Sequence, residues 1–265
     1  MSSTMVERVK QRQIAQLVSL GKRLDDRGLT DYREVQLEVG VIERAEGSAR
    51  VRLGKTEIMV GVKIEAGEPY SDTPNEGVLT VNAELVPLAS PTFEPGPPDE
   101  NSIELARIVD RGLRESKAID LGKLCIQPGK KVFIIFVDIY VLNHDGNLID
   151  ASAMAALAAL LNTKMFSYEI KEGELVRKPD FTPLPIKNHP VAVTFAKISD
   201  KLVVDPWLEE EQVMDARLTI TVEKDGRICA VQKGGSGCFA IQQVLEAANT
   251  AQQKSEELRR ILVKD

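Results

Sequence analysis

The sequence is poor in the residues that cross-link a fold or hold a soft metal. Its 265 residues include only two histidines and three cysteines. The cysteines, Cys125, Cys229 and Cys238, are odd in number and lack Cys-x-x-Cys spacing, which argues against a disulfide framework and a zinc ribbon. Free thiols suit a reducing compartment, so we expect a cytoplasmic protein.

Long apolar runs and a net positive charge are also absent. No apolar stretch approaches the ~18 residues of a membrane-spanning helix, and residues 1–13 are too polar for a signal peptide. The 34 basic and 40 acidic residues give a net charge of −6. We therefore expect a soluble protein without a membrane partner, which attracts a nucleic acid only through a local basic patch.

Familiar catalytic motifs are missing as well. The sequence has no Gly-x-Ser-x-Gly, Walker A, His-Glu-x-x-His or Gly-x-Gly-x-x-Gly motif. His144 lies beside a turn and His189 precedes Pro190, so both are predicted to be solvated loop residues rather than catalytic bases. The run KGGSG at 233–237 could present backbone amides to an anion, but no Lys-Ser or Lys-Thr pair follows it, which favours a flexible link. The sequence predicts no cofactor and no metal site.

What is present is the composition of a globular protein, with 43% hydrophobic and 28% charged residues. Apolar residues recur at a period of two in some segments and near 3.6 in others, which predicts both strands and helices. In each half of the chain, strands and a hairpin precede a helix, a pattern typical of the α+β class. The expected helices are 5–20, 102–117, 150–162 and the segment from about 239, and the expected strands are 35–41, 50–53, 56–64, 78–86, 131–142, 191–198, 201–205, 216–223 and 227–232. Prolines and mixed charge in 167–190 predict a surface connection between the halves.

Three arginines stand out on the expected helix 102–117. Arg107, Arg111 and Arg114 follow i, i+4, i+7 spacing, which confines them to an arc of roughly 60° on the helix surface. One interpretation is a solvated face balanced by neighbouring acidic residues through i, i+3 and i+4 pairs. The other is a patch that follows phosphates, because guanidinium groups match phosphate oxygens. Spacing alone favours the solvated face.

Acidic residues cluster between 205 and 215. The cluster consists of Asp205, Glu209, Glu210, Glu211 and Asp215. Carboxylates are ligands that hard cations prefer, so a magnesium or general-acid site is one interpretation. Carboxylates also favour the first turn of a helix, and spacing alone favours this solvated first turn.

Three longer segments together resemble the RNase PH family, and within it the non-catalytic ring subunits of the archaeal exosome. These are VNAELVPLAS at 81–90, EPGPPDENSIELARIVDRGLRES at 94–116 and LVVDPWLEEEQVMDA at 202–216. The likeness extends from residues 22–33 to the last helix. It implies two RNase PH-type βα halves packed as a pseudo-duplicated unit, and RNA threaded through the channel of a hexameric ring. The implied divisions are an N-terminal helix and arm at 1–30, a first half at 31–166, a connecting segment at 167–190 and a C-terminal half at 191–265.

The motif positions that carry phosphorolysis in this family differ here. Active members have an arginine-rich run before the helix that begins SIEL, where this sequence has Asp99 and Glu100. Active members also bind phosphate with a Gly-Thr/Ser-Arg turn before the small-residue helix, where this sequence has Asp-Ala-Ser-Ala at 150–153. Asp215 matches the catalytic aspartate, but phosphate needs cationic or amide donors that orient it for attack. The family's Arg-x-Asp-Gly-Arg element appears at 23–27 with aspartate in place of glycine.

The resemblance therefore implies a subunit without catalytic residues in an exosome, a complex that degrades RNA by 3′-to-5′ phosphorolysis. The implied partners are a catalytic sister subunit in a ring of three heterodimers, cap subunits with RNA-binding domains, and single-stranded RNA. In such a subunit the positions of Arg107 and Arg111 contact RNA phosphates beside the sister's active site, and we include Arg114 as a third candidate. The alternative is an autonomous phosphorolytic 3′-to-5′ exoribonuclease.

Overall fold

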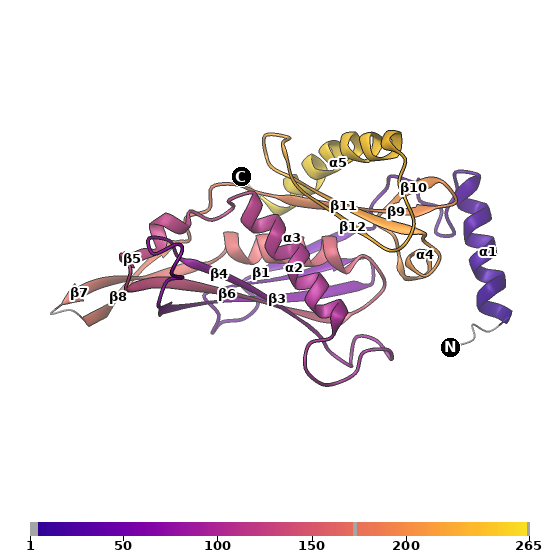
Figure 1. Cartoon of the computed structure of the whole chain (residues 1–265). Helices are drawn as coiled ribbons and strands as arrows, with labels where there is room; N and C mark the ends of the chain where they lie inside the picture. Colours follow the sequence, from indigo (N-terminus) through magenta and orange to yellow (C-terminus); the bar gives the residue numbers. More distant parts are fainter. Residues whose placement is uncertain (1–4, 172–173, 264–265) are drawn as a thin grey trace.

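Two larger antiparallel-rich sheets, the helices packed on them and a separate two-stranded sheet make up the described part of the protein, as the computed structural model in Figure 1 shows. The structure describes residues 5–171 and 174–263. Helix α1 (Met5–Ser19) comes first and lies on the second sheet, where Ile14 and Val18 pack against Ala196 and Val203. Mixed helices and strands in two successive units confirm the predicted α+β class.

The first sheet has the strand order β1-β2-β3-β6-β4, and the short β5 also pairs with β6. The parallel pairing of β4 with β6 is made possible by the crossover through α2. The apolar segment expected as a central strand is β6, which lies between β3 and β4. The elements are β1 (Val35–Val39), β2 (Gly47–Leu53), β3 (Thr56–Gly67), β4 (Val78–Leu85), α2 (Glu100–Glu115), the 3-10 helix η1 (Leu121–Leu124), β5 (Cys125–Gln127), β6 (Lys131–Asn143) and α3 (Leu148–Leu161).

The second sheet has the order β10-β9-β11-β12 and pairs antiparallel throughout. The Asp225-Gly226 turn joins β11 to β12 as the sequence predicts, and Gly226 has the positive φ of 83° that this turn requires. The elements of this half are β9 (Val191–Ile198), β10 (Lys201–Val204), α4 (Leu208–Glu211), β11 (Ala216–Val222), β12 (Ile228–Gly234) and α5 (Ile241–Leu262).

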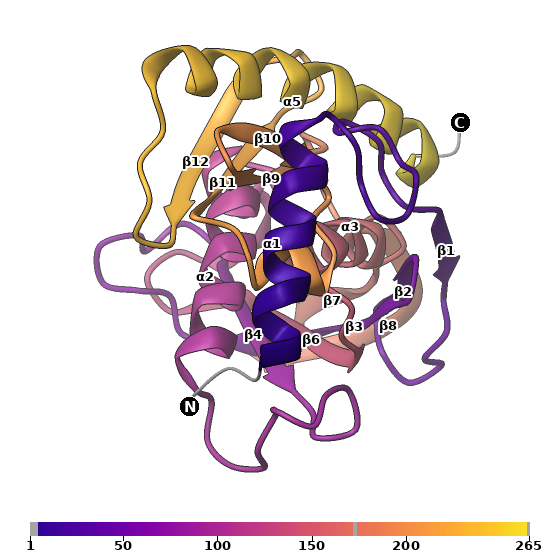
Figure 2. The same cartoon turned by 90° about the vertical axis from the view of Figure 1, so that its right-hand side faces the viewer.

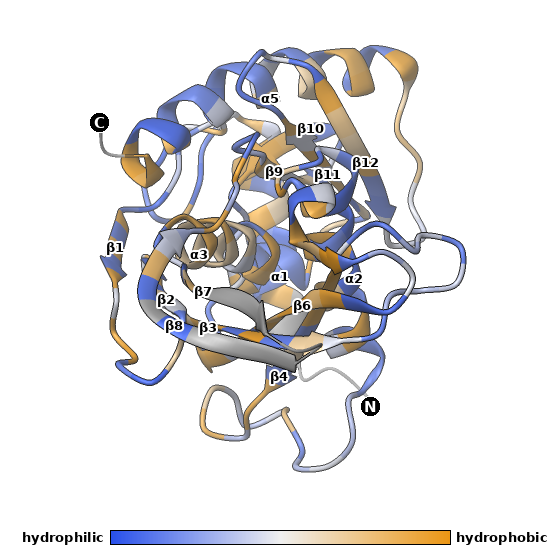
Figure 3. Cartoon of the chain, turned by 90° about the vertical axis from the view of Figure 1, so that its left-hand side faces the viewer, coloured by the Kyte–Doolittle hydropathy of each residue, from blue (hydrophilic) through white to orange (hydrophobic). Residues whose placement is uncertain are grey.

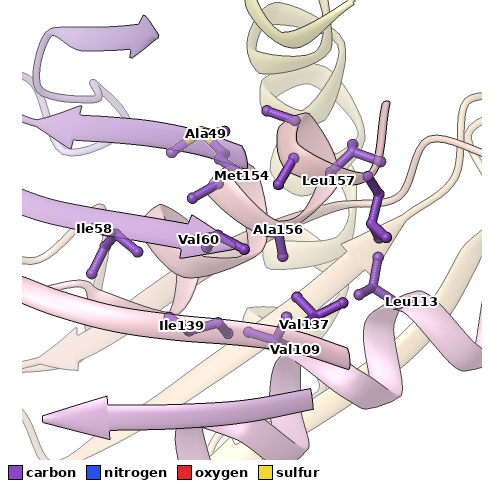
Figure 4. Packing of buried hydrophobic residues seen from close by; sticks show 14 of the residues in the cluster. Ala49, Ile58, Val60, Val109, Leu113, Val137, Ile139, Met154, Ala156 and Leu157 are labelled. Atoms are coloured by element: carbon purple, nitrogen blue, oxygen red, sulfur yellow. The ribbon is translucent and has the colours of Figure 1, made fainter. Parts of the chain in front are cut away.

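Helix α3 forms the centre of the molecule and joins the two halves. Its small and apolar residues pack on β2 and β3 on one side and on β9 on the other, and it appears as an apolar core element in Figure 3. In Figure 4, Met154 and Leu157 of α3 lie among side chains from β3, β6 and α2. Each fully buried side chain of this size contributes about 1.5–3 kcal/mol to folding. No helix in the described ranges is long and apolar enough to span a bilayer.

Two segments differ from the sequence expectation. The connection 167–190 contains much of a two-stranded antiparallel sheet, β7 (Lys164–Lys171) and β8 (Glu174–Pro183), which leads to the second half. Helix α5, across the top in Figure 2, begins with apolar residues at helical spacing, a pattern that predicts a buried face, but Ile241 is 80% and Leu245 59% exposed. The side chains that α5 buries there are small, Ala247 and Ala251, and these allow close approach to the sheet.

Candidate functional site

The three candidate arginines lie on the exposed side of α2, but their surroundings differ. Arg107 has no hydrogen bond or ion pair with any residue in the described ranges. Arg111 makes one long contact, from Nη1 to the Gln232 side-chain oxygen of β12 at 3.4 Å. Arg114 donates to both carboxylate oxygens of Asp110, at 2.7 and 3.1 Å, and to the Leu79 carbonyl at 2.9 Å. Arg107 and Arg111 are therefore available to a ligand, whereas the guanidinium of Arg114 is already engaged.

An ion pair joins this helix to the other half of the protein. Arg217 on β11 donates from Nη2 to Glu104 of α2 at 2.8 Å. About two turns further along α2, Gly112 faces Thr221 so closely that a Cβ built there would lie 3.4 Å from the Thr221 side chain. These contacts hold α2 against the second sheet, so that the helix face with Arg107 lies beside β12. Glu104 and Arg217 are 113 residues apart in the sequence.

The start of α2 carries acidic residues in a structural role. Asp99 is the N-cap, and its side chain accepts the Ser102 N–H at 2.8 Å, which holds the pKa of Asp99 below its usual value. The helix begins at Glu100, two residues before the expected start, and the Ser102 hydroxyl donates to the Asp99 carbonyl. The first turn of α2 contains the acidic Glu100 and no basic side chain.

The start of α3 is likewise surrounded by carboxylates. Its N-cap is Asn147 rather than the expected Asp150, and Asn147 adopts a left-handed conformation with φ of 50°. The Asn147 N–H donates to Glu211 at 2.9 Å. The Asn147 side chain donates to Asp150 at 2.9 Å and to Asp205 at 2.8 Å. A helix N-terminus favours anions, and here the chain's own carboxylates surround it.

Asp150 is fully buried and accepts hydrogen bonds from both halves. The Tyr32 hydroxyl donates to it at 2.7 Å, the Thr194 hydroxyl at 2.7 Å and the Thr194 N–H at 3.0 Å. Burial raises the pKa of Asp150 to about 6 in spite of these donors. Burial and the nearby Asp150 charge also raise the pKa of Tyr32. The carboxylate thus connects α3 to the strand β9.

The interpretation of the 205–215 cluster as a solvated helix turn is wrong for its best-buried members. Glu210 is 1% exposed and forms a two-point ion pair with Arg23, at 2.9 and 2.5 Å. Asp205 is completely buried and binds Arg33 through two side-chain hydrogen bonds of 2.8 and 2.9 Å. The described residues contain no group of three or more His, Cys, Asp or Glu side chains placed to hold a metal ion. Asp205 and Glu210 are instead the carboxylates of a buried ion-pair network.

The arginines of that network come from the arm that follows α1. Arg27 donates from Nη1 to Asp205 at 2.9 Å, and the Arg33 backbone N–H donates to the same carboxylate at 2.9 Å. Between the arginines Arg23 and Arg27, Asp26 holds a φ of 60°. The aspartate that replaces the family's glycine therefore keeps the left-handed backbone that glycine favours. We name the set of Arg23, Arg27, Arg33, Asn147, Asp205 and Glu210 the arm network.

The match of Asp215 to a catalytic aspartate is not accompanied by a phosphate site. Asp215 is exposed, its N–H donates to the Lys197 carbonyl at 2.8 Å, and its own carbonyl accepts the Gly237 N–H at 2.8 Å. Gly237 belongs to the KGGSG run, which links β12 to α5 as expected. The side chain of Asp215 has no hydrogen bond or ion pair within the ranges that the structure covers.

Sequence reasoning missed a cavity of about 260 Å³ between α2, the end of β6 and the start of α3. His144, expected to be solvated, is partly buried and stacks on Phe93 with ring centroids 5.3 Å apart and an interplanar angle of 18°. Both rings line this cavity together with Glu104, Glu211 and Arg217. These five residues come from two loops, two helices and a strand that are far apart in the sequence, so no local spacing could have indicated the cavity.

The sequence matches a known protein family. Residues 31–165 match the model of domain 1 of the 3′ exoribonuclease family, and residues 188–254 match the model of domain 2 of the same family. The chain is 54% identical over 252 residues to the exosome complex component Rrp42 of Thermococcus gammatolerans, covering 94% of this chain and 92% of that protein. It is 50% identical over 261 residues to the Rrp42 component of Methanopyrus kandleri, covering 98% of both chains.

Solved structures of similar proteins have the same fold. A chain of the Archaeoglobus fulgidus exosome with RNA bound to the active site superposes with a TM-score of 0.90 at 47% identity, covering 98% of this chain and all of that chain. A chain of an archaeal exosome core superposes with a TM-score of 0.86 at 44% identity, covering 97% of this chain and 98% of that one.

Proposed function

Because this chain belongs to the RNase PH family of 3′ exoribonucleases, we propose that it is a non-catalytic subunit of an exosome of the archaeal kind, which structures the active site of a catalytic sister subunit and helps to bind RNA. The observation that carries the non-catalytic part is the ring of carboxylates around the start of α3. Glu211, Asp150 and Asp205 lie where an active relative would need donors for phosphate.

Electrostatics oppose phosphate at this place. Three carboxylates accept hydrogen bonds from Asn147, and Arg33 of the arm network is already paired with Asp205. Burial raises the pKa of Asp150 to about 6 and that of Glu211 to about 7. Above neutral pH, a phosphate dianion entering here would therefore meet like charges in a partly buried setting, where repulsion is stronger than in water. This arrangement does not favour the alternative of an autonomous phosphorolytic exoribonuclease.

The purified chain alone is expected to release no nucleoside diphosphates from poly(A) in the presence of phosphate, because it cannot bind and orient that nucleophile. Activity is expected once the sister subunit is added. Asp215→Asn should leave the activity of the assembled complex unchanged. Turnover by the chain alone at the rate of the complex, abolished by Asp215→Asn, would contradict the proposal.

The proposed partner is the catalytic sister subunit, in a ring of three alternating pairs that also carries cap subunits. Two strands support this: β4 is an edge of the first sheet and β12 an edge of the second. Their surroundings expose apolar side chains, among them Tyr140 beside β4 at 40% and Val231 on β12 at 48%. Unpaired strand edges with apolar neighbours are typical places for another chain to pair.

Mixing this 29.2 kDa chain with its sister is expected to give a ring several times that mass, because both edges then gain partners. Size-exclusion chromatography with light scattering measures the mass directly. Separate monomers of both chains at micromolar concentration would be incompatible with the ring. The single chain on its own serves as the mass reference.

A further inference from the structure

The cavity beside α2 has an aromatic wall. Phe93, from the loop before α2, and His144, from the end of β6, stack nearly parallel and both line it. Burial lowers the pKa of His144, so the imidazole is neutral near pH 7. Neutral aromatic rings at a cavity wall are surfaces on which nucleobases of single-stranded RNA stack.

The charged side chains that line the same cavity are mainly hydrogen-bond acceptors, which do not favour a phosphate. Glu104 and Glu211 are two carboxylates, and the single guanidinium, Arg217, is already bonded to Glu104 at 2.8 Å. Glu211 gives one oxygen to the Asn147 N–H at 2.9 Å, and its other oxygen has no partner among the described residues. Burial raises the pKa of Glu211 to about 7, so this side chain accepts as a carboxylate above neutral pH. A phosphate is disfavoured next to such groups, whereas a neutral base with an amino group offers the donors that carboxylates accept.

The position of the cavity relates it to the arginine face. Glu104 lines the cavity, and Arg107 and Arg111 follow it at i+3 and i+7, so all three lie on one side of α2. An RNA strand whose phosphates contact these arginines therefore runs along the same side of α2 that lines the cavity. A volume of about 260 Å³ is below that of pockets for drug-sized ligands, which suits a single base.

We propose that this cavity, lined by Phe93, His144, Glu104, Glu211 and Arg217, binds one nucleobase of a single-stranded RNA and prefers bases with an exocyclic amino group. The inference rests on the proposed function, since it needs RNA to reach α2. The aromatic pair supplies the stacking surface, and the two carboxylates accept from the amino group. Uracil carries no amino group, and its one edge donor, N3–H, lies between two carbonyl oxygens that repel carboxylates, so at least one of the two acceptors stays unpaired.

The test compares oligocytidylate with oligouridylate of equal length, because cytosine and uracil have the same ring size and differ at C4. Fluorescence anisotropy with the full-length chain is expected to give about tenfold tighter binding of oligocytidylate, the effect of one hydrogen bond to a charged group. The double variant Glu104→Ala/Glu211→Ala should bring the two affinities close together. Arg107→Ala/Arg111→Ala is the control, and it should weaken both oligonucleotides equally and keep their ratio.

A second measurement does not depend on how the variants fold. An oligonucleotide with 5-iodocytidine, cross-linked by light to the unmodified chain, should attach to the peptides that contain Phe93 or His144. Equal affinity for both oligonucleotides, with both weakened by the arginine variant, would overturn the base site and leave the proposed function standing. Cross-links elsewhere, or a preference that survives the double glutamate variant, would also overturn it. No binding of either oligonucleotide would overturn the base site, whereas the proposed function, which concerns the assembled complex, is tested separately by the release of nucleoside diphosphates.

Discussion

Replacing Asp205 by asparagine is expected to lower the free energy of unfolding by about 3–5 kcal/mol, the usual cost of removing one partner of a buried charge pair. Asp205 is completely buried and faces Arg27 and Arg33 in the arm network. Asparagine has nearly the same shape and tolerates the positive φ of 49° found there, so backbone strain does not contribute. The two guanidinium groups would remain without their counter-charge in a site of low exposure.

Asp200→Asn is the matched control for this variant. Asp200 also has a positive φ, 63°, but its side chain is 88% exposed and pairs only with Lys197 at the surface. Such a pair contributes less than about 1 kcal/mol. Urea denaturation followed by circular dichroism measures both variants, and similar losses at the two positions would contradict the importance of the arm network.

The stability difference should also depend on pH in a definite direction. Burial alone would raise the pKa of Asp205, but the hydrogen bonds and charge of Arg33 outweigh burial and hold that pKa below its ordinary value. Ionised Asp205 therefore stabilises the fold fully above the unfolded-state pKa of about 3.9, and this contribution disappears as the pH falls through the lower folded pKa. Wild type and Asp205→Asn are expected to converge in acid.

Removing Arg107 and Arg111 together is expected to weaken RNA binding by the assembled complex and to flatten its dependence on salt. Each phosphate contact on single-stranded RNA adds about 0.7 to the slope of log K against log salt, so the double alanine variant should lose about 1.4. Both side chains are exposed, so ring assembly should be unaffected. The loss should be similar for all base sequences, because phosphate contacts carry no base information.

The double variant Lys130→Ala/Lys131→Ala removes two positive charges from the exposed turn before β6 and is the control for net charge. Arg114→Ala should have a smaller effect on the salt slope than either single arginine variant, because Asp110 already pairs with that guanidinium. An unchanged slope and affinity in intact rings of the Arg107/Arg111 variant would mean that the arginines are only a solvated face.

The parts of the fold that depend on local periodicity were predictable from the sequence. The buried helix α3 followed from its run of alanine and leucine, and the hairpins at Gly54 and Gly226 followed from turn residues that need positive φ. The buried face at the start of α5 was not predictable in this way. Ile241 and Leu245 repeat at helical spacing, yet the sheet beneath them accepts only the small side chains of Ala247 and Ala251.

The candidate site was predictable only where it lies on one element. The spacing of Arg107 and Arg111 places them on one face of α2, and the structure has them exposed there. The partners of Asp205 are different, since Arg33 is 172 residues away and Arg27 178 residues away in the sequence. A local sequence pattern cannot distinguish a buried carboxylate that pairs with such a distant arginine from one that is exposed to water.

The arm network also limits which halves of related proteins can be combined in one chain. Its arginines precede the first sheet, and its carboxylates, Asp205 and Glu210, belong to the second half. A recombination event that exchanged one half with that of a distant relative would separate guanidinium groups from their carboxylates and bury both unpaired. A chimera of this kind is therefore expected to be less stable than either parent, although the two halves have a similar order of elements.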